Sequence, residues 1–294
     1  MSRPESRLFS WHEDPEFFVA AVSFTAKETT FSPRLVEKDY FCTVLLGYLA
    51  TVGNTFVFKG GTCLAKIHAD FYRLSEDLDF VVSMPVDSLR AERSKKASVL
   101  KDIVNALPDR LPGFRVIEPL TGSNNSTQYN AMIGYDSKIV GKEEMVKLEV
   151  GLREPLLLPP ETGLAKTLLL DPTTEKPLSE PLVLNCMSKR EAFAEKFRAA
   201  LSRKEAAVRD FFDLDFAVRR LGLQPKDVGL IELVRKKMAV PGNEQVDVSE
   251  DRLAMLHRQL ESQLRPVLRA RDYVEFDLER AFRIVKDMAA MSVS

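Results

Sequence analysis

The fold is decided by the stretch Lys59-Gly-Gly-Thr-Cys-Leu-Ala-Lys-Ile-His-Ala-Asp-Phe-Tyr-Arg-Leu-Ser-Glu-Asp-Leu-Asp-Phe80. A short apolar segment over 55–58 predicts a strand before it, and a second apolar segment over 78–82 predicts a strand at its end. Between the two strands, the Gly-Gly pair is followed by a helical pattern over 62–71. The stretch therefore predicts a strand, a glycine turn, a helix and a second strand in direct succession.

The sequence around this stretch predicts a sheet-bearing first part and a helical second part. In the first part, helices are expected over 15–29, 32–51 and 86–107, and strands over 114–118, 128–135 and 144–150, with a turn at Gly141. Residues 151–185 are rich in proline and leucine and favour no element. Further helices are expected over 188–201, 206–221, 226–239, 249–269 and 276–291. This order is typical of an α+β fold, divided most simply into domains over 1–185 and 186–294.

The composition is that of a soluble globular protein, with 294 residues of which 45% are hydrophobic and 29% charged. The 42 basic and 43 acidic residues nearly cancel, which excludes a uniformly basic nucleic-acid coat but not a local basic patch. No stretch approaches the roughly 20 apolar residues that cross a bilayer, and the first residues lack the apolar core of a signal peptide. We therefore expect a cytoplasmic protein without a membrane partner.

The cysteines and histidines are few and far apart in the sequence. The cysteines are Cys42, Cys63 and Cys186, and the histidines are His12, His68 and His257. This spacing fits neither a disulfide framework nor a metal site built from locally spaced ligands. We expect Cys63 to fill a small space in the core and His68 to be a packing or surface residue.

The acids at the end of the decisive stretch predict a metal site. Asp77 and Asp79 are two residues apart in a strand, so both carboxylates share one face while Leu78 and Phe80 face the core. Two neighbouring carboxylates repel each other unless a cation neutralises them, and Mg²⁺ prefers oxygen ligands. A third acid, Glu149, lies between two apolar residues on a later predicted strand. If the two strands are neighbours, the acids could bind two Mg²⁺ ions roughly 3.5–4 Å apart.

The glycine turn supplies a complementary phosphate site. Gly60 and Gly61 let backbone N–H groups approach a phosphate closely, and Thr62 is expected to cap the helix and offer a hydroxyl. Each piece alone has a simpler interpretation, because Asp-x-Asp is often a solvated strand edge and Gly-Gly is often only a tight turn. The joint order of the pieces favours phosphoryl-transfer chemistry.

That order resembles the DNA-polymerase-β-like nucleotidyltransferase superfamily, and more specifically the AbiEii-type toxins of bacterial abortive-infection and toxin–antitoxin systems, which include the mycobacterial MenT nucleotidyltransferases. The stretches that carry the resemblance are Val36-Glu-Lys-Asp-Tyr40, Lys59-Gly-Gly-Thr62 with Leu64 and Lys66, Arg73-Leu-Ser-Glu-Asp-Leu-Asp-Phe80, and Glu195-Lys196 with Arg203 and Arg209-Asp-Phe-Phe-Asp-Leu214. The resemblance implies a mixed sheet with flanking helices, followed by a helical domain. The third acid is placed by its pattern alone, since no comparably specific motif lies over 84–185.

The resemblance also implies roles for individual residues. Asp77 and Asp79 would bind Mg²⁺, and Ser75 would lie close to the phosphates of a nucleoside triphosphate (NTP). Lys196 and Asp210 match a lysine and an aspartate of the family's helical part, the lysine as a contact of the triphosphate. Two further lysines that flank the glycine turn are expected as secondary phosphate contacts: Lys59 and Lys66. Taken alone, each lysine favours the simpler interpretation of a solvated charge at a helix or strand end. Lys196 is the exception, because Asp210 and Asp213 are three residues apart and share one helix face beside it.

The function that follows from the resemblance is that of a toxin which transfers a nucleoside monophosphate from an NTP to the 3′ end of a tRNA and so blocks translation. Residues 186–240 hold 13 Lys and Arg against 8 Asp and Glu, a net of +5, which suits the phosphates of an RNA end. Ordinary helix surface charge explains the same count. A cognate antitoxin is the expected protein partner. Two alternatives stay open: transfer of AMP to a protein hydroxyl, and an idle domain that binds a nucleotide or a partner.

Overall fold

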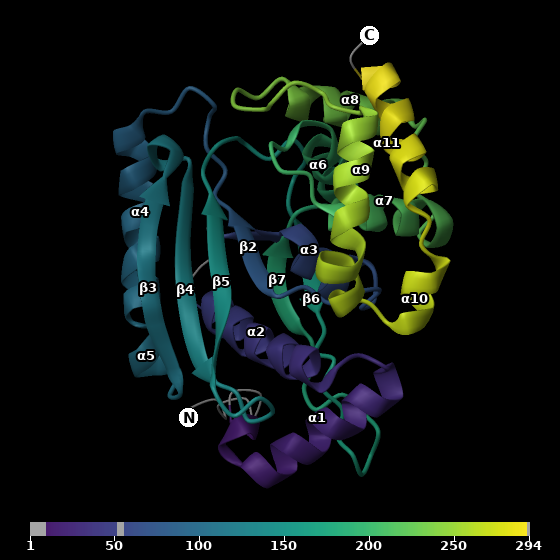
Figure 1. Cartoon of the computed structure of the whole chain (residues 1–294). Helices are drawn as coiled ribbons and strands as arrows, with labels where there is room; N and C mark the ends of the chain where they lie inside the picture. The colour runs from purple at the N-terminus through teal and green to yellow at the C-terminus, as the bar shows by residue number, and fades with distance from the viewer. Residues whose placement is uncertain (1–9, 52–55, 293–294) are drawn as a thin grey trace. The chain divides into compact units, whose positions relative to one another are not determined.

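The computed structural model of the chain describes residues 10–51 and 56–292 (Figure 1). Contacts divide the chain into two compact units. The first unit comprises Met1–Leu156 and Pro160–Cys186, and the second comprises Leu157–Pro159 and Met187–Ser294. The division into independent domains at residue 185 stays a prediction, because compact contacts alone do not establish that either part folds by itself.

The described part of the first unit contains a seven-stranded mixed sheet, as the resemblance implies. The strand order is β3-β4-β5-β2-β1-β7-β6, with parallel pairing between β2 and β5 and between β1 and β7 and antiparallel pairing elsewhere. The strands are β1 (Val57–Lys59), β2 (Asp77–Val81), β3 (Phe114–Ser123), β4 (Gln128–Asp136), β5 (Glu143–Gly151), β6 (Glu161–Ala165) and β7 (Leu182–Cys186). The strand β6 and all of β7 except Cys186 lie in the segment 151–185, for which the sequence favoured no element. The first residue of the predicted strand over 55–58, Thr55, lies outside the described residues.

The helices of the first unit follow the predictions with two corrections. They are η2 (Trp11–Glu13), α1 (Pro15–Thr29), α2 (Pro33–Thr51), α3 (Gly60–Cys63), η3 (Leu64–His68), α4 (Arg90–Asn105), α5 (Leu107–Arg110) and η4 (Asn124–Ser126). The helix predicted over 62–71 begins earlier and continues as the π-helix η3, which ends at His68. The helix predicted over 86–107 starts later and is broken after Asn105, because Pro108 has no N–H to continue the hydrogen-bond ladder.

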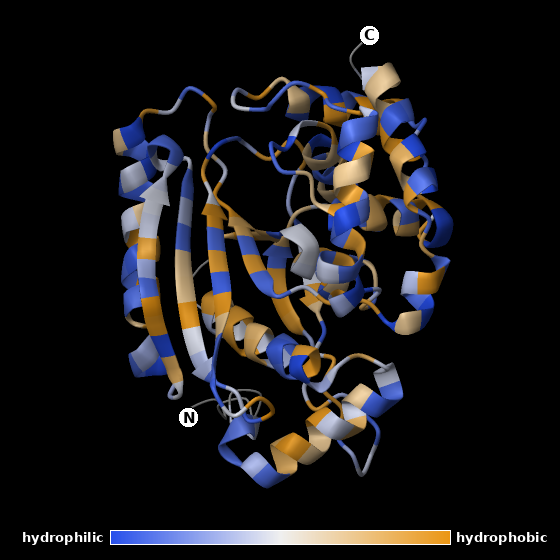
Figure 2. Ribbon diagram, in the orientation of Figure 1, coloured by the Kyte–Doolittle hydropathy of each residue, from blue (hydrophilic) through white to orange (hydrophobic). Residues whose placement is uncertain are grey.

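The core of the first unit lies on one face of the sheet. Helix α2 is buried from Leu35 to Leu49 and joins residues of α4 and of strands β2, β4 and β5 in a single apolar cluster. Leu78 and Phe80 point into this cluster and are 1% and 4% exposed, as the alternation in the sequence predicts. Figure 2 shows the corresponding alternation of apolar and polar residues along the strands. The opposite face of β2 therefore carries the polar residues of the strand.

The second unit is helical, with α6 (Lys189–Ser202), α7 (Val208–Arg220), α8 (Val228–Met238), α9 (Glu250–Gln259), η5 (Leu260–Leu264), η6 (Arg265–Val267), α10 (Ala270–Glu275) and α11 (Leu278–Ser292). Its core includes the stacked rings of Phe211 and Phe282, whose centroids are 5.9 Å apart. The helix predicted over 249–269 continues as a π-helix from Leu260 and as a 3₁₀-helix from Arg265, where Pro266 has no N–H to continue the ladder. The helix α10 was not predicted. Across both units, the described helices are too short or too polar to cross a membrane.

Candidate active site on the sheet

The structure brings the three predicted acids to one face of the sheet. Asp77 and Asp79 are both half-buried, and the buried Leu78 between them points the other way. Strand β5 lies directly beside β2 in parallel, and the register pairs Asp79 with Glu149 and Asp77 with Lys147. Since paired residues of neighbouring strands share a face, all of these polar side chains lie on the side away from the α2 core.

The two acids Asp79 and Glu149 belong to a polar row that crosses four strands. Asp79 pairs with Lys59 on β1, and Glu149 pairs with Asn130 on β4. The four residues of this row, Lys59, Asp79, Glu149 and Asn130, are half-buried. A row of charged and amide groups on a half-buried sheet face is costly unless it serves a ligand or is internally paired.

Part of this cost is offset by Lys147. Its Nζ lies 2.8 Å from Glu149 Oε2, and the two side chains are 40% and 28% exposed. Burial acts to lower the pKa of Lys147, but the hydrogen bond to Glu149 and the charges of Asp77 and Asp79 outweigh it and raise the pKa above its ordinary value. The ammonium group therefore lies in the field of three carboxylates, a setting that suits a cation.

The donor set of this face fits Mg²⁺, because carboxylate oxygens are the ligands that this ion prefers. The three carboxylates are not drawn into one tight cluster. In the described residues, oxygen atoms of Asp77, Asp79 and Glu149 do not all come within 4.8 Å of one another. Oε2 of Glu149 is held by Lys147 instead, so the second carboxylate oxygen, Oε1, is the atom that a shared ion would contact while the lysine keeps Glu149 oriented.

The glycine turn lies against the acids. Gly60 has a φ of +77°, and a Cβ at this position would be 2.1 Å from Oδ2 of Asp79. A Cβ on Gly61 would be 2.6 Å from an Arg73 guanidinium nitrogen and 3.0 Å from Oγ of Ser75. Only glycine fits at either position without moving these groups. The turn therefore places backbone atoms next to Asp79 and Ser75, the neighbourhood that the sequence predicted for a phosphate.

Thr62 does not cap the helix, which corrects the prediction. The N-cap residue is Lys59, whose side chain makes no capping hydrogen bond. The buried Thr62 hydroxyl instead donates to the backbone carbonyl of Asp77. The reason is that the helix already begins at Gly60, so Thr62 lies inside it, where its side chain can fasten the turn to β2.

Lys66 is not on the acid face. Its side chain is fully buried, and its ammonium group lies 2.7 Å from Oδ1 of Asp39 and 2.7 Å from Oγ1 of Thr43, both on α2. An ammonium group has three donors. The two contacts above and a third, at 3.3 Å to the backbone carbonyl of Asp39, occupy them. The structure therefore gives Lys66 a role in fastening η3 to α2 and does not offer it to a phosphate.

The neighbouring motif Val36-Glu-Lys-Asp-Tyr40 has a similar structural role. Buried Glu37 accepts hydrogen bonds from the Ser137 hydroxyl and from the backbone N–H groups of Lys138, at 2.6 Å, and Ile139, at 3.2 Å. Burial raises the pKa of Glu37 above its ordinary value, although these hydrogen bonds oppose the rise. The motif thus ties α2 to the β4–β5 turn on the core side of the sheet.

Lys196 and Asp210 meet in the second unit. Lys196 Nζ on α6 lies 2.7 Å from Asp210 Oδ1 and 2.8 Å from Asp213 Oδ2, both on α7. The two aspartates are 6% and 0% exposed and the lysine 13%. Arg203 adds a contact to Asp210 at 3.4 Å. This ion-pair cluster fastens α6 to α7, and contact of Lys196 with a triphosphate stays a prediction.

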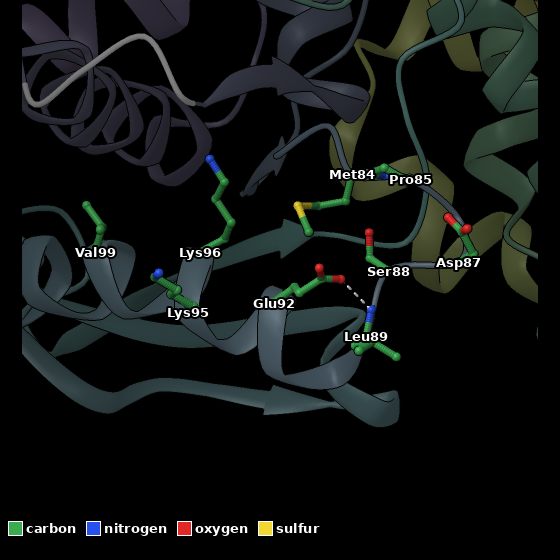
Figure 3. A pocket seen from close by; sticks show the side chains of 9 residues that line it. All are labelled: Met84, Pro85, Asp87, Ser88, Leu89, Glu92, Lys95, Lys96 and Val99. Carbon is green, nitrogen blue, oxygen red and sulfur yellow. Dashed lines mark hydrogen bonds between the residues drawn. The ribbon is translucent and has the colours of Figure 1, made fainter.

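A pocket of about 830 Å³ opens elsewhere in the first unit (Figure 3). It lies between the segment that follows β2 and helix α4, and its lining residues are Met84, Pro85, Asp87, Ser88, Leu89, Glu92, Lys95, Lys96 and Val99. Glu92 accepts a hydrogen bond of 2.7 Å from the backbone of Leu89 and so caps α4. The pocket includes none of the predicted site residues, so it is separate from the acid face.

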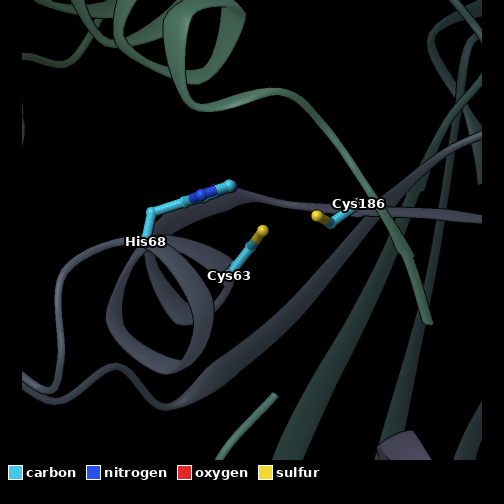
Figure 4. A group of neighbouring side chains, drawn as sticks. All are labelled: Cys63, His68 and Cys186. Atoms are coloured by element: carbon cyan, nitrogen blue, oxygen red, sulfur yellow. The ribbon is translucent and has the colours of Figure 1, made fainter. Parts of the chain in front are cut away.

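Sequence spacing gave no signal for a second group of chemically active side chains. Cys63, His68 and Cys186 lie together in the first unit, with ligand atoms within 4.8 Å of one another (Figure 4). Burial raises the pKa of the Cys63 thiol. A hydrogen bond from that thiol, helped by His68 and opposed by burial, lowers the pKa of Cys186 to about 6. Cys63 and Cys186 are so far apart in the sequence that only the three-dimensional structure reveals their contact.

Comparison with known proteins identifies the chain's relatives. The family described as the nucleotidyl transferase AbiEii toxin of a type IV toxin–antitoxin system matches residues 44–285. MenT4, a nucleotidyltransferase toxin from Mycobacterium tuberculosis H37Rv, is similar in structure at 17% identity, with a TM-score of 0.52 over 92% of this chain and 98% of that one. JHP933 from Helicobacter pylori has a TM-score of 0.46 at 16% identity over 88% of each chain. No curated protein matches.

The MenT4 likeness bears on the fold, and the family match covers the acid face, the glycine turn and most of the second unit. The predicted resemblance and fold class are therefore confirmed. The chain belongs to the AbiEii family of nucleotidyltransferase toxins of type IV toxin–antitoxin systems.

Proposed function

We propose that the polar face of β2 and β5 is the catalytic face and that it transfers a nucleoside monophosphate from an NTP to the 3′ hydroxyl of a tRNA. The observation that supports this most is the parallel pairing of Asp79 with Glu149 directly beside the Gly60 turn. Family membership supplies the reaction class. The metal, the residue roles and the acceptor are the parts that we propose.

Asp77, Asp79 and Glu149 would hold Mg²⁺. A bound Mg²⁺ would neutralise charge on the phosphates and make the acceptor hydroxyl a better nucleophile. The chain's own contribution is to hold these carboxylates in place: Leu78 anchors β2 in the core, and Lys147 orients Glu149. The buried anchor allows the acids to stay close together despite their repulsion.

The glycine turn would bind the triphosphate. The backbone of Gly60 lies against Asp79 and that of Gly61 against Ser75, and Lys59 belongs to the same polar row. Backbone N–H groups at the start of a helix and a nearby cation suit an anion. We propose Gly60, Gly61, Ser75 and Lys59 as phosphate contacts, with Thr62 acting only through the position of the turn.

In the second unit, Lys196 and Asp210 remain proposed contributors, the lysine as a contact of the triphosphate. Their mutual ion pair keeps the ammonium group in a fixed position on α6. If Lys196 binds the triphosphate, the Lys196→Met variant should still melt cooperatively but have a higher KM for NTP. A purely structural role would lower the melting temperature and leave the KM of the folded fraction unchanged.

The tRNA acceptor follows from the resemblance, and the basic segment over 186–240 supports it only in part. At least eight of its 13 cations form ion pairs with carboxylates of the second unit. These cations are Arg190, Lys196, Arg198, Arg203, Arg219, Arg220, Lys236 and Lys237. Ion-paired cations attract phosphates less than unpaired ones, so transfer to a protein hydroxyl is the main alternative that an experiment must separate. A cognate antitoxin would restrain the activity in either case.

The test incubates the purified protein with Mg²⁺, each α-labelled NTP in turn, and either total tRNA or total protein. We expect label in the 3′ end of tRNA, and loss of labelling in Asp79→Asn. Glu143→Gln is the matched control, because Glu143 lies on β5 on the same face but away from the polar row. Label in protein would replace the proposed acceptor, and no label with any NTP would refute the proposed activity.

A further inference from the structure

Three side chains with nitrogen and sulfur donors converge from three separate elements of the first unit. Cys63 is the last residue of α3, His68 is the last residue of η3, and Cys186 is the last residue of β7. Their Sγ atoms and a ring nitrogen all lie within 4.8 Å of one another (Figure 4). Both cysteines are fully buried and the histidine is half-buried. The group is thus enclosed on the cysteine side and accessible from the histidine side.

The π-helix explains how Cys63 and His68 reach the same place. In an α-helix, residues five apart are separated by roughly 140° around the axis, at about 100° per residue. In a π-helix, with i→i+5 hydrogen bonds and roughly 4.4 residues per turn, the separation falls to roughly 50°. Residues Leu64–His68 form such a segment. The wider turn therefore brings the imidazole round to the side of the thiol, and π-helical segments are frequent at functional sites.

Strand pairing delivers the third donor. Cys186 pairs with Phe58, the middle residue of β1, two residues before Gly60, where the glycine turn and α3 begin. On its other side β6 places Gly163 so that a Cβ there would be 2.8 Å from the Cys186 sulfur. The glycine leaves the room that the sulfur occupies. Glu161 on β6 pairs directly with Cys186 and adds a negative charge near the group.

We propose that Cys63, His68 and Cys186 bind a zinc ion, with the fourth position open to water. Zinc takes tetrahedral sets of thiolate and imidazole at about 2.3 Å and 2.0–2.1 Å. Those bond lengths separate the ligand atoms by roughly 3.6–3.8 Å, which lies inside the observed limit of 4.8 Å. Sulfur and imidazole donors favour zinc over magnesium, so this site is chemically distinct from the acid face. Binding would release the thiol protons to solvent.

A zinc ion there would fasten α3 and η3, which follow the glycine turn, to the end of β7. It would therefore stabilise the first unit whether or not the acid face is catalytic. This makes the proposal independent of the proposed function, and its test measures metal binding and stability without any transfer assay.

The experiment titrates metal-free protein with Co²⁺ and then displaces the Co²⁺ with Zn²⁺ in competition with a chromophoric chelator. We expect one equivalent of tetrahedral Co²⁺ with a sulfur-to-cobalt charge-transfer band, and a melting temperature raised by Zn²⁺. His68→Gln and Cys186→Ser should each weaken zinc binding by at least about tenfold. Loss of a residue that only hydrogen-bonds to a metal ligand already costs about that much affinity, and loss of the ligand itself should cost more. Two controls should bind zinc normally: Cys42→Ser, another buried cysteine, and Asp79→Asn on the acid face.

Several outcomes would overturn the proposal. The first is a wild-type protein without the charge-transfer band, and the second is unchanged zinc affinity in His68→Gln. His68 is half-buried, so its replacement is the variant that should fold even if the buried cysteine variant does not. The third is a metal-free protein whose mass is lower by two hydrogens and that binds no zinc after mild reduction. That result would assign Cys63 and Cys186 to a disulfide instead.

Discussion

Replacing Gly60 by alanine should separate the two demands that the structure makes of this position. The first demand is backbone conformation, because Gly60 has a φ of +77°, and a left-handed conformation costs an alanine about 1 kcal/mol. The second is space, because the new Cβ would lie 2.1 Å from the Asp79 carboxylate oxygen. Real Cβ atoms stay at least 3.0 Å from such neighbours, so the carboxylate or the turn must move by about 0.9 Å.

Gly141 provides a matched control. Its φ is +73°, and a Cβ there would meet nothing within 4 Å. Gly141→Ala should therefore cost about 1 kcal/mol of unfolding free energy and leave transfer unchanged. Gly60→Ala should cost that much plus about 1–3 kcal/mol for the overlap. A displacement of about 1 Å in a catalytic group can cost about 100-fold in rate, and we expect a loss of this order.

The assay is the initial rate of label transfer at saturating Mg²⁺, with the melting temperature of each variant as the stability readout. A Gly60→Ala protein with the wild-type rate would refute the inference that Asp79 must stay where the turn holds it. Equal losses of rate in both variants would show that backbone strain, and not the approach to Asp79, is responsible.

The other predictions concern the ionic groups of the first unit. Lys147→Met leaves Glu149 without its cation, so Mg²⁺ should raise the melting temperature of this variant more than that of the wild type. Equal Mg²⁺-induced shifts of the melting temperature in the two proteins would count against a metal at this face. Lys66→Met should lower the free energy of unfolding, measured by urea titration, by about 3–5 kcal/mol, because Asp39 is left buried without its lysine. A loss below about 1 kcal/mol would show that the ion pair is not essential. The raised pKa of Glu37 means that its carboxyl group holds a proton more tightly in the folded protein than in the unfolded chain. The contribution of Glu37 to stability therefore falls as the pH rises from the ordinary pKa of 4.5 through the folded value. Glu37→Gln should remove this fall, and parallel stability–pH curves for the two proteins would refute the assignment.

The sequence predicted the acid face because the alternation of strand residues is local. Asp77 and Asp79 had to share a face once β2 was a strand, and Leu78 had to be buried. Whether Glu149 joined them depended on the order of strands in the sheet, which is a long-range property. Glu149 was selected by its pattern alone, as an acid between two apolar residues on a predicted strand, and that pattern says nothing about which strand lies beside β2.

Other features could not be derived from the sequence. Lys66 has the same local signature as a phosphate-binding lysine, and only the position of α2 shows that its partner is Asp39. The pairing of Cys63 with Cys186 depends on β7, which lies in a proline-rich segment without a clear strand pattern. The break in the helix after Asn105, in contrast, could have been predicted from Pro108 alone.

The central claim is that Glu149 acts together with Asp77 and Asp79 on one metal-binding face. The most direct test measures the Mg²⁺ dependence of label transfer by Glu149→Gln beside Glu143→Gln, the exposed acid on the same strand. The account predicts that Glu143→Gln keeps the wild-type Mg²⁺ curve, whereas Glu149→Gln needs far more Mg²⁺ or loses transfer while keeping its melting temperature. An unchanged Mg²⁺ curve in Glu149→Gln would contradict the account.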